Sequence, residues 1–259
     1  MFKNGVDTVV PEPIPSRVYA VCQYIKKHRG QKQDIMHAVC MDDVFTASDN
    51  SDIFNHSLNA AVELGLVKGV DNEYSAEEAL LGINSMVDFR RYAANEIFKR
   101  PESLIFKITS LYCEYAEEML QYTKWEQVVE SLGNHGLQFP YNAILGWRFW
   151  VPFLGCGYLN DTVMLPNWYV RFDDLLASQK EFKPGQMVPI KDFVEWIEAK
   201  CPEVRKSRKE TQLGLGVSNG LRTLEAMGKV KLERQPDSLQ WQLYRFEGSN
   251  DISHVIIAR

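Results

Sequence analysis

The sequence predicts a mainly α-helical protein with small β-hairpins, an α+β fold, because two features recur along it. Apolar residues follow helical spacing over most of the chain. In addition, a helix that ends at a glycine and is followed by a short hairpin is repeated, at Leu64-Gly65, Leu154-Gly155 and Met227-Gly228. The three glycines are 90 and 73 residues apart, each interval about the size of one small domain with its connectors. The spacing predicts three tandem modules.

The predicted modules divide the 259 residues into three parts. Residues 1–82 hold a polar, proline-rich arm and module 1. Residues 83–176 hold a helical connector and an aromatic-rich module 2, and residues 177–259 hold a basic module 3. Helices are expected to join one module to the next.

Module 1 is predicted to contain short helices and one hairpin. Ser16 follows a proline and is a candidate cap for the first helix, which reaches about Lys27. The predicted segments are helices at residues 16–27, 35–40 and 52–64, a polar turn at 46–51 and a hairpin at 66–74.

The connector and module 2 are predicted to be helical apart from one hairpin. Residues 76–132 keep apolar residues at helical spacing and break once, near Lys99 to Pro101. The basic pairs Arg90-Arg91 and Lys99-Arg100 lie among acidic residues and are interpreted as a solvated face. An apolar helix then ends at Leu154-Gly155, and residues 157–165 are predicted to form a strand, a turn and a second strand.

Module 3 is predicted to contain two helices and a hairpin. A linker at residues 179–186 precedes the first helix, and a basic run at residues 205–209 separates the two helices. The second helix is expected to begin near Ser218 and to stop at Gly228. The predicted segments are helices at residues 190–199 and 218–227, a strand at 230–233, a turn at 235–238 and a strand at 239–243.

Charge is distributed unevenly along a chain whose formal net charge is -5. Duplex DNA is bound largely by Lys and Arg side chains that neutralise phosphates, so the chain as a whole is a poor non-specific binder. Between Pro202 and Arg234, however, eight basic residues stand against four acidic ones. This local positive charge predicts a DNA-facing element in module 3 of an otherwise acidic assembly protein.

Several protein classes are disfavoured by features that the sequence lacks. Apolar runs stay well below the roughly 20 residues of a membrane-spanning helix, and the N-terminal stretch does not resemble a secretory signal. The five cysteines are scattered without C-x-x-C spacing, and the five histidines are dispersed, so neither a disulfide framework nor a metal site is indicated. We expect a cytoplasmic protein that binds no cofactor and no metal and does not associate with a membrane.

One serine motif bears on whether the chain is an enzyme. Residues 216–220, Gly-Val-Ser-Asn-Gly, match the G-x-S-x-G nucleophile elbow. The preceding residues 208–215 contain no buried strand, and His254 is the only histidine downstream. A helix-capping role for Ser218 is therefore favoured. The dinucleotide fingerprint fails at Asn219 and no phosphate-binding P-loop occurs, so we assign no catalytic residue.

The modules resemble the winged helix-turn-helix superfamily. Residues 221–243, LRTLEAMGKVKLERQPDSLQWQL, are similar to the recognition helix and wing of many bacterial transcription regulators. The resemblance implies a helix face that enters a DNA groove and a wing that reaches the phosphates. With the basic run before the helix, the expected DNA-binding residues are Arg205, Lys206, Arg208, Lys209, Ser218, Asn219, Arg222, Thr223, Lys231, Arg234 and Gln235. The corresponding helices of modules 1 and 2 carry little positive charge and are not assigned to DNA.

Module 2 contains a cluster of aromatic residues that allows two interpretations. Most of them are expected to form its core and to pack against neighbouring modules. Aromatic residues crowded this closely cannot all face one core, so some are expected to meet a partner protein. The protein-interaction candidates are Trp147, Trp150, Tyr158 and Trp168.

The combination of modules is also similar to multi-winged-helix proteins of bacterial DNA-modification and phage-defence gene clusters. The expected function is a non-enzymatic adaptor or assembly subunit that brings a partner protein complex to duplex DNA. A protein partner or self-association is expected beside the DNA. Two alternatives stay open, an assembly subunit that binds only proteins and a transcriptional regulator.

Overall fold

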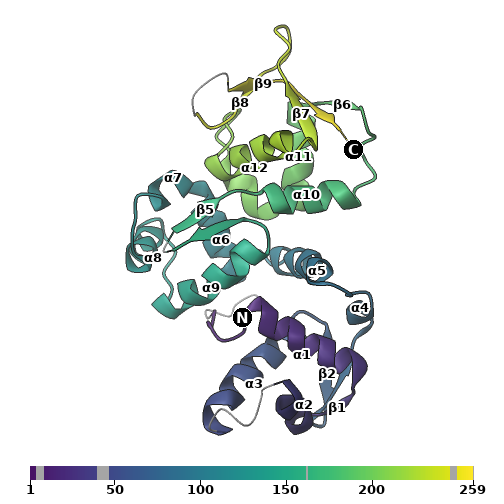
Figure 1. Ribbon diagram of the computed structural model, residues 1–259. Coiled ribbons are helices and arrows are strands. Elements are labelled where there is room, and N and C mark those ends of the chain that lie inside the picture. Colours follow the sequence, from purple (N-terminus) through teal and green to yellow (C-terminus); the bar gives the residue numbers. More distant parts are fainter. Residues whose placement is uncertain (4–8, 40–46, 162, 246–249, 259) are drawn as a thin grey trace. The chain divides into compact units, whose positions relative to one another are not determined.

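A computed structural model describes residues 1–3, 9–39, 47–161, 163–245 and 250–258 (Figure 1). The structure is 54% helical, with several small antiparallel sheets, so the predicted α+β class is confirmed. The chain forms two compact units. Unit 1 contains residues 1–105 and 139–153, and unit 2 contains residues 106–138 and 154–259. The division into three modules stays a prediction.

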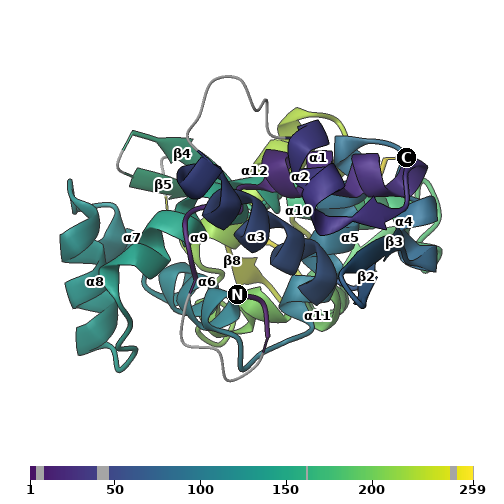
Figure 2. The same cartoon turned by 90° about the horizontal axis from the view of Figure 1, so that it is seen from below.

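Residues 15–76 of unit 1, called here the N-terminal motif, combine helices with a small sheet. The strands pair antiparallel in the order β1-β3-β2, and β2 and β3 form a hairpin (Figure 2). Buried residues on α1 recur at helical spacing and face the sheet and α3. The elements are α1 (Pro15–Lys27), β1 (Gly30–Gln31), α2 (Lys32–Val39), α3 (Ala47–Glu63), β2 (Val67–Val70) and β3 (Glu73–Ala76).

Two details of this motif differ from the predictions. Helix α1 begins at Pro15, whose fixed φ suits a first helical turn, and its N-cap residue is Ile14. Ser16 is exposed inside the helix and is not the cap. The predicted polar turn at residues 46–51 is helical from Ala47 on, because α3 starts there. Cys40 and Thr46 lie outside the described residues.

Helices follow one another between the N-terminal motif and the next hairpin. The predicted break near Lys99 to Pro101 is confirmed, because one helix ends at Phe98 and the next begins at Leu104. The helices are α4 (Glu78–Leu81), α5 (Met86–Phe98), α6 (Leu104–Glu114), α7 (Ala116–Met119), α8 (Trp125–Asn134) and α9 (Tyr141–Phe153).

The core of unit 1 includes part of the N-terminal arm. Phe2 is fully buried and meets the edge of Trp150, with ring centroids 4.7 Å apart. The indole Nε1 of Trp150 donates a hydrogen bond to the carbonyl oxygen of Pro13 at 2.7 Å. Phe89 of α5 also packs against Trp150. These contacts fix the described part of the arm on α9.

Unit 2 continues with a hairpin and then with a second helix–sheet motif, residues 169–257, called the C-terminal motif. Strands β4 (Gly157–Asn160) and β5 (Val163–Pro166) pair antiparallel, as predicted, although Thr162 between them is not described. The elements of the C-terminal motif are α10 (Tyr169–Ser178), β6 (Met187–Pro189), α11 (Ile190–Lys200), the 3₁₀ helix η1 (Pro202–Ser207), α12 (Leu215–Ala226), β7 (Val230–Glu233), β8 (Trp241–Gln242), β9 (Asp251–Ile252) and β10 (His254–Ile257).

The glycine after each hairpin-preceding helix has the left-handed conformation. Gly65, Gly155 and Gly228 have φ angles of 72°, 89° and 66°, a region in which a Cβ atom is disfavoured. After α3 the Leu66 N–H bonds to the Ala61 carbonyl, and after α12 the Lys229 N–H bonds to the Leu224 carbonyl. Both bonds belong to the glycine-terminated Schellman motif. The glycine stop is therefore confirmed in all three places, and an adjacent hairpin follows it after α3 and α9.

The N-terminal and C-terminal motifs share one topology. In each, the described elements run helix, strand, helix, helix, strand and strand, apart from the 3₁₀ turn η1 and the short strands β8 and β9 of the C-terminal motif. The sheets have the orders β1-β3-β2 and β6-β10-β7, so the third strand lies between the first and the second in both. Two of the three predicted copies, the first and the third, thus share one arrangement of elements.

The predicted hairpin of the C-terminal motif is wrong in its pairing. Strand β7 pairs with β10 at the end of the described chain, with Val230 opposite Ile257, and not with residues 239–243. Trp241 of β8 instead pairs with Ile252 of β9. Val255 and Ile257 are buried, and β10 finds a pairing partner on each side, which a short adjacent hairpin would not provide.

Within the part of the chain that the structure describes, every helix is too short or too polar to cross a bilayer.

Candidate nucleic-acid interface

The helix predicted to read DNA, α12, lies mostly inside unit 2. It begins at Leu215, three residues before the predicted start, and Ser218 within it is fully buried. The Ser218 Oγ donates to the carbonyl oxygen of Leu213 at 3.3 Å and accepts the Tyr244 N–H at 2.8 Å. Ser218 therefore ties α12 to two neighbouring segments. It is not the helix cap, and it is not accessible as a nucleophile.

Two more residues of the predicted recognition face bond to the end of the β4–β5 hairpin. The Asn219 Nδ2 donates to the carbonyl oxygen of Pro166 at 3.0 Å. The Thr223 Oγ1 accepts a hydrogen bond from Asn167 Nδ2 at 3.1 Å and donates to the Asn219 carbonyl at 2.8 Å. These polar groups stabilise the packing of α12 on the hairpin.

Arg222, the positive charge of this face, also bonds within unit 2. Its Nη2 donates to the carbonyl oxygen of Tyr244 at 2.7 Å and to Asn250 Oδ1 at 2.6 Å. Burial lowers the pKa of the Arg222 guanidinium below its usual range. Together, Ser218, Asn219, Arg222 and Thr223 form what we call the helix group, and each of its side chains is bonded to a neighbouring segment or to the helix backbone.

The glycines of the G-x-S-x-G sequence have a packing role. A Cβ atom on Gly216 would lie 2.6 Å from Cζ3 of Trp168, and one on Gly220 would lie 2.9 Å from Cε2 of Phe172. Only glycine allows α12 to lie this close to α10 and to the Trp168 ring, which is itself fully buried. The motif is a helix-packing sequence.

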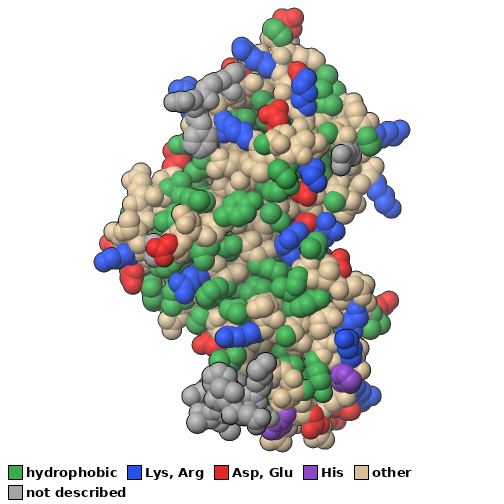
Figure 3. Space-filling model, viewed as in Figure 1, with side chains coloured by type: hydrophobic (Ala, Val, Ile, Leu, Met, Phe, Trp, Pro, Cys, Tyr) green, Lys and Arg blue, Asp and Glu red, His purple; other side chains and the backbone are tan. Residues whose placement is uncertain are grey.

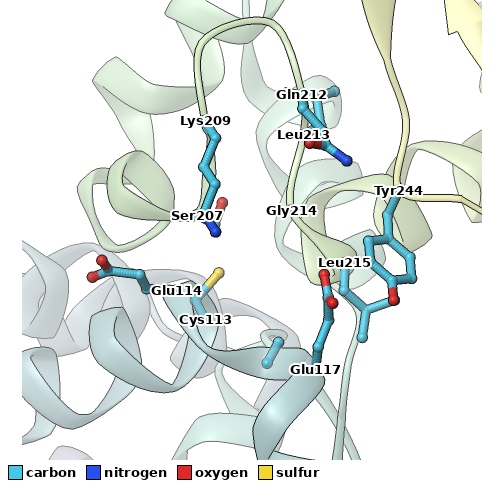
Figure 4. A pocket seen from close by; sticks show the side chains of 11 residues that line it. Cys113, Glu114, Glu117, Ser207, Lys209, Gln212, Leu213, Gly214, Leu215 and Tyr244 are labelled. Atoms are coloured by element: carbon cyan, nitrogen blue, oxygen red, sulfur yellow. The ribbon is translucent and has the colours of Figure 1, made fainter. Parts of the chain in front are cut away.

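The N-terminal end of α12 meets α6 and α7 at a small hollow of about 60 Å³ (Figure 4). Leu215 of α12 and Lys209 of the preceding loop line it together with Glu114 and Glu117. The Glu117 side chain points from α7 toward the start of α12, beside Tyr244 (Figure 4). Burial raises the pKa of the Tyr244 hydroxyl, and the negative charge of Glu117 adds to the shift. Acidic groups therefore stand at this end of the helix.

The basic run before α12 contains three exposed basic residues and one half-buried basic residue. Arg205, Lys206 and Lys209 are exposed, and we call these three the basic turn. Arg208 is half-buried, and its Nε and Nη2 donate to the Glu198 carboxylate at 2.8 and 3.1 Å. Its guanidinium also lies 5.0 Å from the ring centroid of Trp241. Arg208 therefore holds η1 against α11 and β8, whereas the basic turn faces solvent.

The predicted wing residues lie near β7 and next to acidic side chains. Lys231 is exposed and pairs with Glu233, which raises the pKa of the Lys231 ammonium. Arg234 is exposed and lies 3.9 Å from the Asp251 carboxylate. Gln235 is half-buried, and its backbone N–H donates to Ser253 Oγ at 2.8 Å. On the face shown in Figure 3, Lys and Arg side chains are likewise scattered among Asp and Glu.

Three of the four predicted protein-interaction residues are buried and one is exposed. Trp147, Trp150 and Trp168 are fully buried, in agreement with the core interpretation. Tyr158 on β4 is 46% exposed. Its cross-strand partner Leu165 on β5 is also exposed, as is Leu159. The hairpin therefore carries exposed apolar side chains. The sequence predicts only Tyr158 among them, because cross-strand pairing is not visible in the sequence.

A buried ion pair in unit 2 was missed by sequence reasoning. The Arg171 Nε of α10 lies 3.4 Å from the Glu203 Oε1 of η1, and both side chains are almost fully buried. Cys156 and Cys201 lie in the same environment, where burial raises the pKa of each thiol. Burial also raises the pKa of the Glu203 carboxyl, against the opposing charge of Arg171. The two residues are 32 positions apart in the sequence, and no local pattern indicates that they pair.

Metal binding is not indicated by the described part of the chain. Within it, His, Cys, Asp and Glu side chains do not gather in groups of three or more that could hold a metal ion.

The fold and the interface define a modular α+β protein with one helix–sheet topology in two copies and an exposed basic turn in the second. A model of the DpdG-like family matches residues 8–238, and the chain belongs to this family. As a DpdG-like protein it is a component of the Dpd DNA modification and defence system. The expected association with bacterial DNA modification and defence is thereby confirmed at the level of the family. Comparison with curated proteins and with solved structures gave no match.

Proposed function

We propose that the chain is a non-enzymatic adaptor of the Dpd system that binds duplex DNA and brings a partner protein assembly to it. The observation that carries the proposal is the shared topology of the N-terminal and C-terminal motifs. Three helices with a sheet in which the third strand lies between the first two are the arrangement expected of a winged helix. Tandem winged helices in a DNA-modification system favour a role in binding DNA and assembling proteins on it.

The basic turn is the part of the predicted DNA-binding set that best suits contact with DNA. Arg205, Lys206 and Lys209 are exposed and close together in sequence, so their charges can approach one stretch of phosphate backbone. Lys231 and Arg234 contribute less, because Glu233 and Asp251 offset their charges. The helix group supports the fold of unit 2.

The exposed hairpin β4–β5 is the part best suited to a protein partner. Tyr158 and Leu165 lie opposite one another on the two strands, on the same face of the hairpin, and both are exposed. Aromatic and apolar side chains of this kind are favoured at the centres of protein interfaces. An adaptor with DNA on its basic turn and a protein on this hairpin would join the two.

The first experiment measures binding of the full chain to a 30-base-pair duplex by fluorescence anisotropy over a series of salt concentrations. We expect binding at low salt that weakens steeply as salt rises, because phosphate contacts release counterions. The same chain, purified from a host that carries the Dpd system, is expected to retain other Dpd components. The double variant Tyr158→Ser, Leu165→Ser should lose those components and keep DNA binding.

A second candidate function, an assembly subunit that binds only proteins, is favoured by the net charge of -5 and by the bonded state of the helix group. Absence of duplex binding at low salt, with Dpd components still retained, would select it over the adaptor. A transcriptional regulator would instead bind one operator sequence much more tightly than other DNA.

A further inference from the structure

Helix α12 has a strip of residues that points away from its buried face, and an equivalent strip exists on α3. Residues at positions i, i+4, i+7 and i+11 share one face of a helix. Opposite the buried residues of α12, the outward strip is Leu215, Asn219, Arg222 and Ala226. Aligning the glycine stops Gly228 and Gly65 gives the outward strip of α3 as Asp52, His56, Asn59 and Glu63. In a winged helix this outward face is the one available to a DNA groove.

The outward strip of α12 is covered over most of its length. Leu215 is 4% exposed and lies in the hollow beside α7. Asn219 is bonded to the hairpin and Arg222 to the segment around Tyr244, and both are only partly exposed. Ala226, the one exposed member, has no polar group that could read a base edge. Direct readout needs side chains that are free to reach the bases.

The charge at the start of α12 also disfavours entry into a groove. Recognition helices place their N-terminal residues against the base edges. At this end of α12, Glu117 points toward the helix and Glu114 lines the same hollow (Figure 4). Two carboxylates against the single ammonium of Lys209 leave this hollow net negative, which opposes phosphates beside the start of α12.

The outward strip of α3 has the opposite character. Asp52 and Asn59 are exposed and His56 is partly exposed, so this strip is open. Its carboxylates are Asp52 and Glu63, and Glu63 accepts hydrogen bonds from the amino group of Met1 and the N–H of Phe2. Arg and Lys are absent from its four positions, all of which the structure describes. The exposed strip of α3 therefore carries no Lys or Arg. The C-terminal motif carries the basic turn, but the corresponding strip of its helix α12 is covered.

We propose that the chain contacts duplex DNA through the phosphate backbone alone, by means of the basic turn, and does not read base sequence. This inference rests on the proposed DNA-binding function and specifies its mode. Arg205, Lys206 and Lys209 are exposed on a short segment, and the Arg205 Nε donates to the Glu198 carbonyl at 2.9 Å, which anchors that side chain at the protein surface. Sequence choice in the system then belongs to another component.

The test uses the full chain and two matched triple variants. In the first, Arg205, Lys206 and Lys209 are changed to Ala. In the control, Lys180, Lys183 and Lys191 of the same unit are changed to Ala, with the same loss of charge. Each protein is titrated with several unrelated 30-base-pair duplexes over a salt series, and the wild type is used to select binders from a pool of random duplexes.

We expect wild-type affinities for unrelated duplexes to agree within about tenfold, far below the roughly thousandfold or more that separates specific from non-specific sites. The slope of log affinity against log salt should fall in magnitude by up to about 2.7 in the basic-turn variant, since each lost phosphate contact contributes about 0.9. The control variant should keep a slope close to that of the wild type.

Three distinguishable outcomes would contradict, in turn, the contact mode, the assignment to the basic turn and the DNA-binding function. Enrichment of a consensus sequence in the selection, with salt-dependent binding intact, would overturn backbone-only contact and leave the adaptor function standing. An equal slope change in both triple variants would overturn the assignment to the basic turn. Failure of the wild type to bind any duplex at low salt would overturn the proposed function itself.

Discussion

Two single residues, Gly216 and Gly220, allow α12 to pack closely against Trp168 and α10. Each lies so close to an aromatic ring of the α10 region that a Cβ atom would collide with it. The same two glycines gave the sequence its resemblance to a nucleophile elbow. Their surroundings show that close helix packing is a sufficient reason for them.

Changing Gly216 to Ala is expected to destabilise the chain by roughly 1–3 kcal/mol, because the new methyl group would lie 2.6 Å from the buried Trp168 ring. The control is Gly133→Ala in α8, where the nearest atom is 3.8 Å away on the flexible Gln138 side chain. There the higher helix propensity of alanine should stabilise by up to about 1 kcal/mol. Urea unfolding should show a lower free energy of unfolding for Gly216→Ala and a higher one for Gly133→Ala. Equal changes in the two variants would contradict the packing argument.

Arg171 and Glu203 form a buried ion pair whose members depend on each other. Arg171→Met is expected to cost about 3–5 kcal/mol near neutral pH, because it leaves the Glu203 carboxylate buried without its partner. Burial already raises the pKa of Glu203 above its usual range, and loss of Arg171 should raise it further. Glu203 then favours folding while protonated, so the variant should be relatively more stable at low pH and lose stability as pH rises through the folded pKa.

Two companion variants test this interpretation of the ion pair. Arg171→Met combined with Glu203→Leu should recover much of the stability, because no unpaired charge remains. Arg205→Met, at an exposed site, should change the free energy of unfolding by less than about 0.5 kcal/mol. A double variant as unstable as Arg171→Met alone would show that packing, and not charge, accounts for the loss.

At the scale of elements, helices α7 and α8 are joined by one carboxylate. Glu118 of α7 accepts hydrogen bonds from Ser131 Oγ and Tyr122 OH and pairs with His135 Nε2 at 2.8 Å. The His135 ring stacks on Tyr115 with centroids 3.5 Å apart. The bonds from Ser131, His135 and Tyr122 lower the pKa of the Glu118 carboxyl.

The pKa of Glu118 is lower in the folded chain than its unfolded value of about 4.3, so the ionised carboxylate stabilises the fold above that pH. This contribution is lost as pH falls through the folded pKa. Ser131→Ala removes the largest cause of the shift, so it should destabilise the chain near neutral pH and differ less from the wild type in acid. Ser57→Ala is the control, because the buried Ser57 hydroxyl donates to the backbone carbonyl of Ile53, which does not titrate. Thermal unfolding from pH 3 to 7 should show a pH-dependent gap for Ser131→Ala alone.

The repeated motifs belong to the same scale. Their glycine stops were predictable, because a left-handed residue after a helix is most easily a glycine. The middle strand β10 was not, since its partners β6 and β7 lie at least 21 residues away in the sequence. Pairing at such a distance leaves no local pattern in the chain.

At the scale of the whole molecule, thiol chemistry reports on both units. Cys22 lies in unit 1, whereas Cys113, Cys156 and Cys201 lie in unit 2, and all four are buried. Burial raises the pKa of Cys22 and of Cys113 to about 12 and that of the other two well above their usual range. A thiol held protonated and away from solvent is a poor nucleophile.

In a Cys40→Ser background, which removes the cysteine outside the described residues, the folded chain should react slowly with a thiol reagent. All four remaining thiols should react rapidly once denaturant unfolds it. Ala226→Cys, at an exposed position of α12, is the positive control and should add one fast thiol. Rapid reaction of the native background would contradict the burial of these cysteines.

The α+β class, the glycine stops, the break after α5 and the basic turn could all be predicted from the amino-acid sequence. Each depends on neighbours in the chain, through helical periodicity, backbone preference or a local run of charge. Only the tertiary structure decided that Ser218, Asn219 and Arg222 face the hairpin and the segment around Tyr244, and that Arg171 and Glu203 form a buried pair. Whether a polar side chain bonds to the protein or stays exposed depends on which distant segments pack against its helix, and a helical pattern alone does not contain that information.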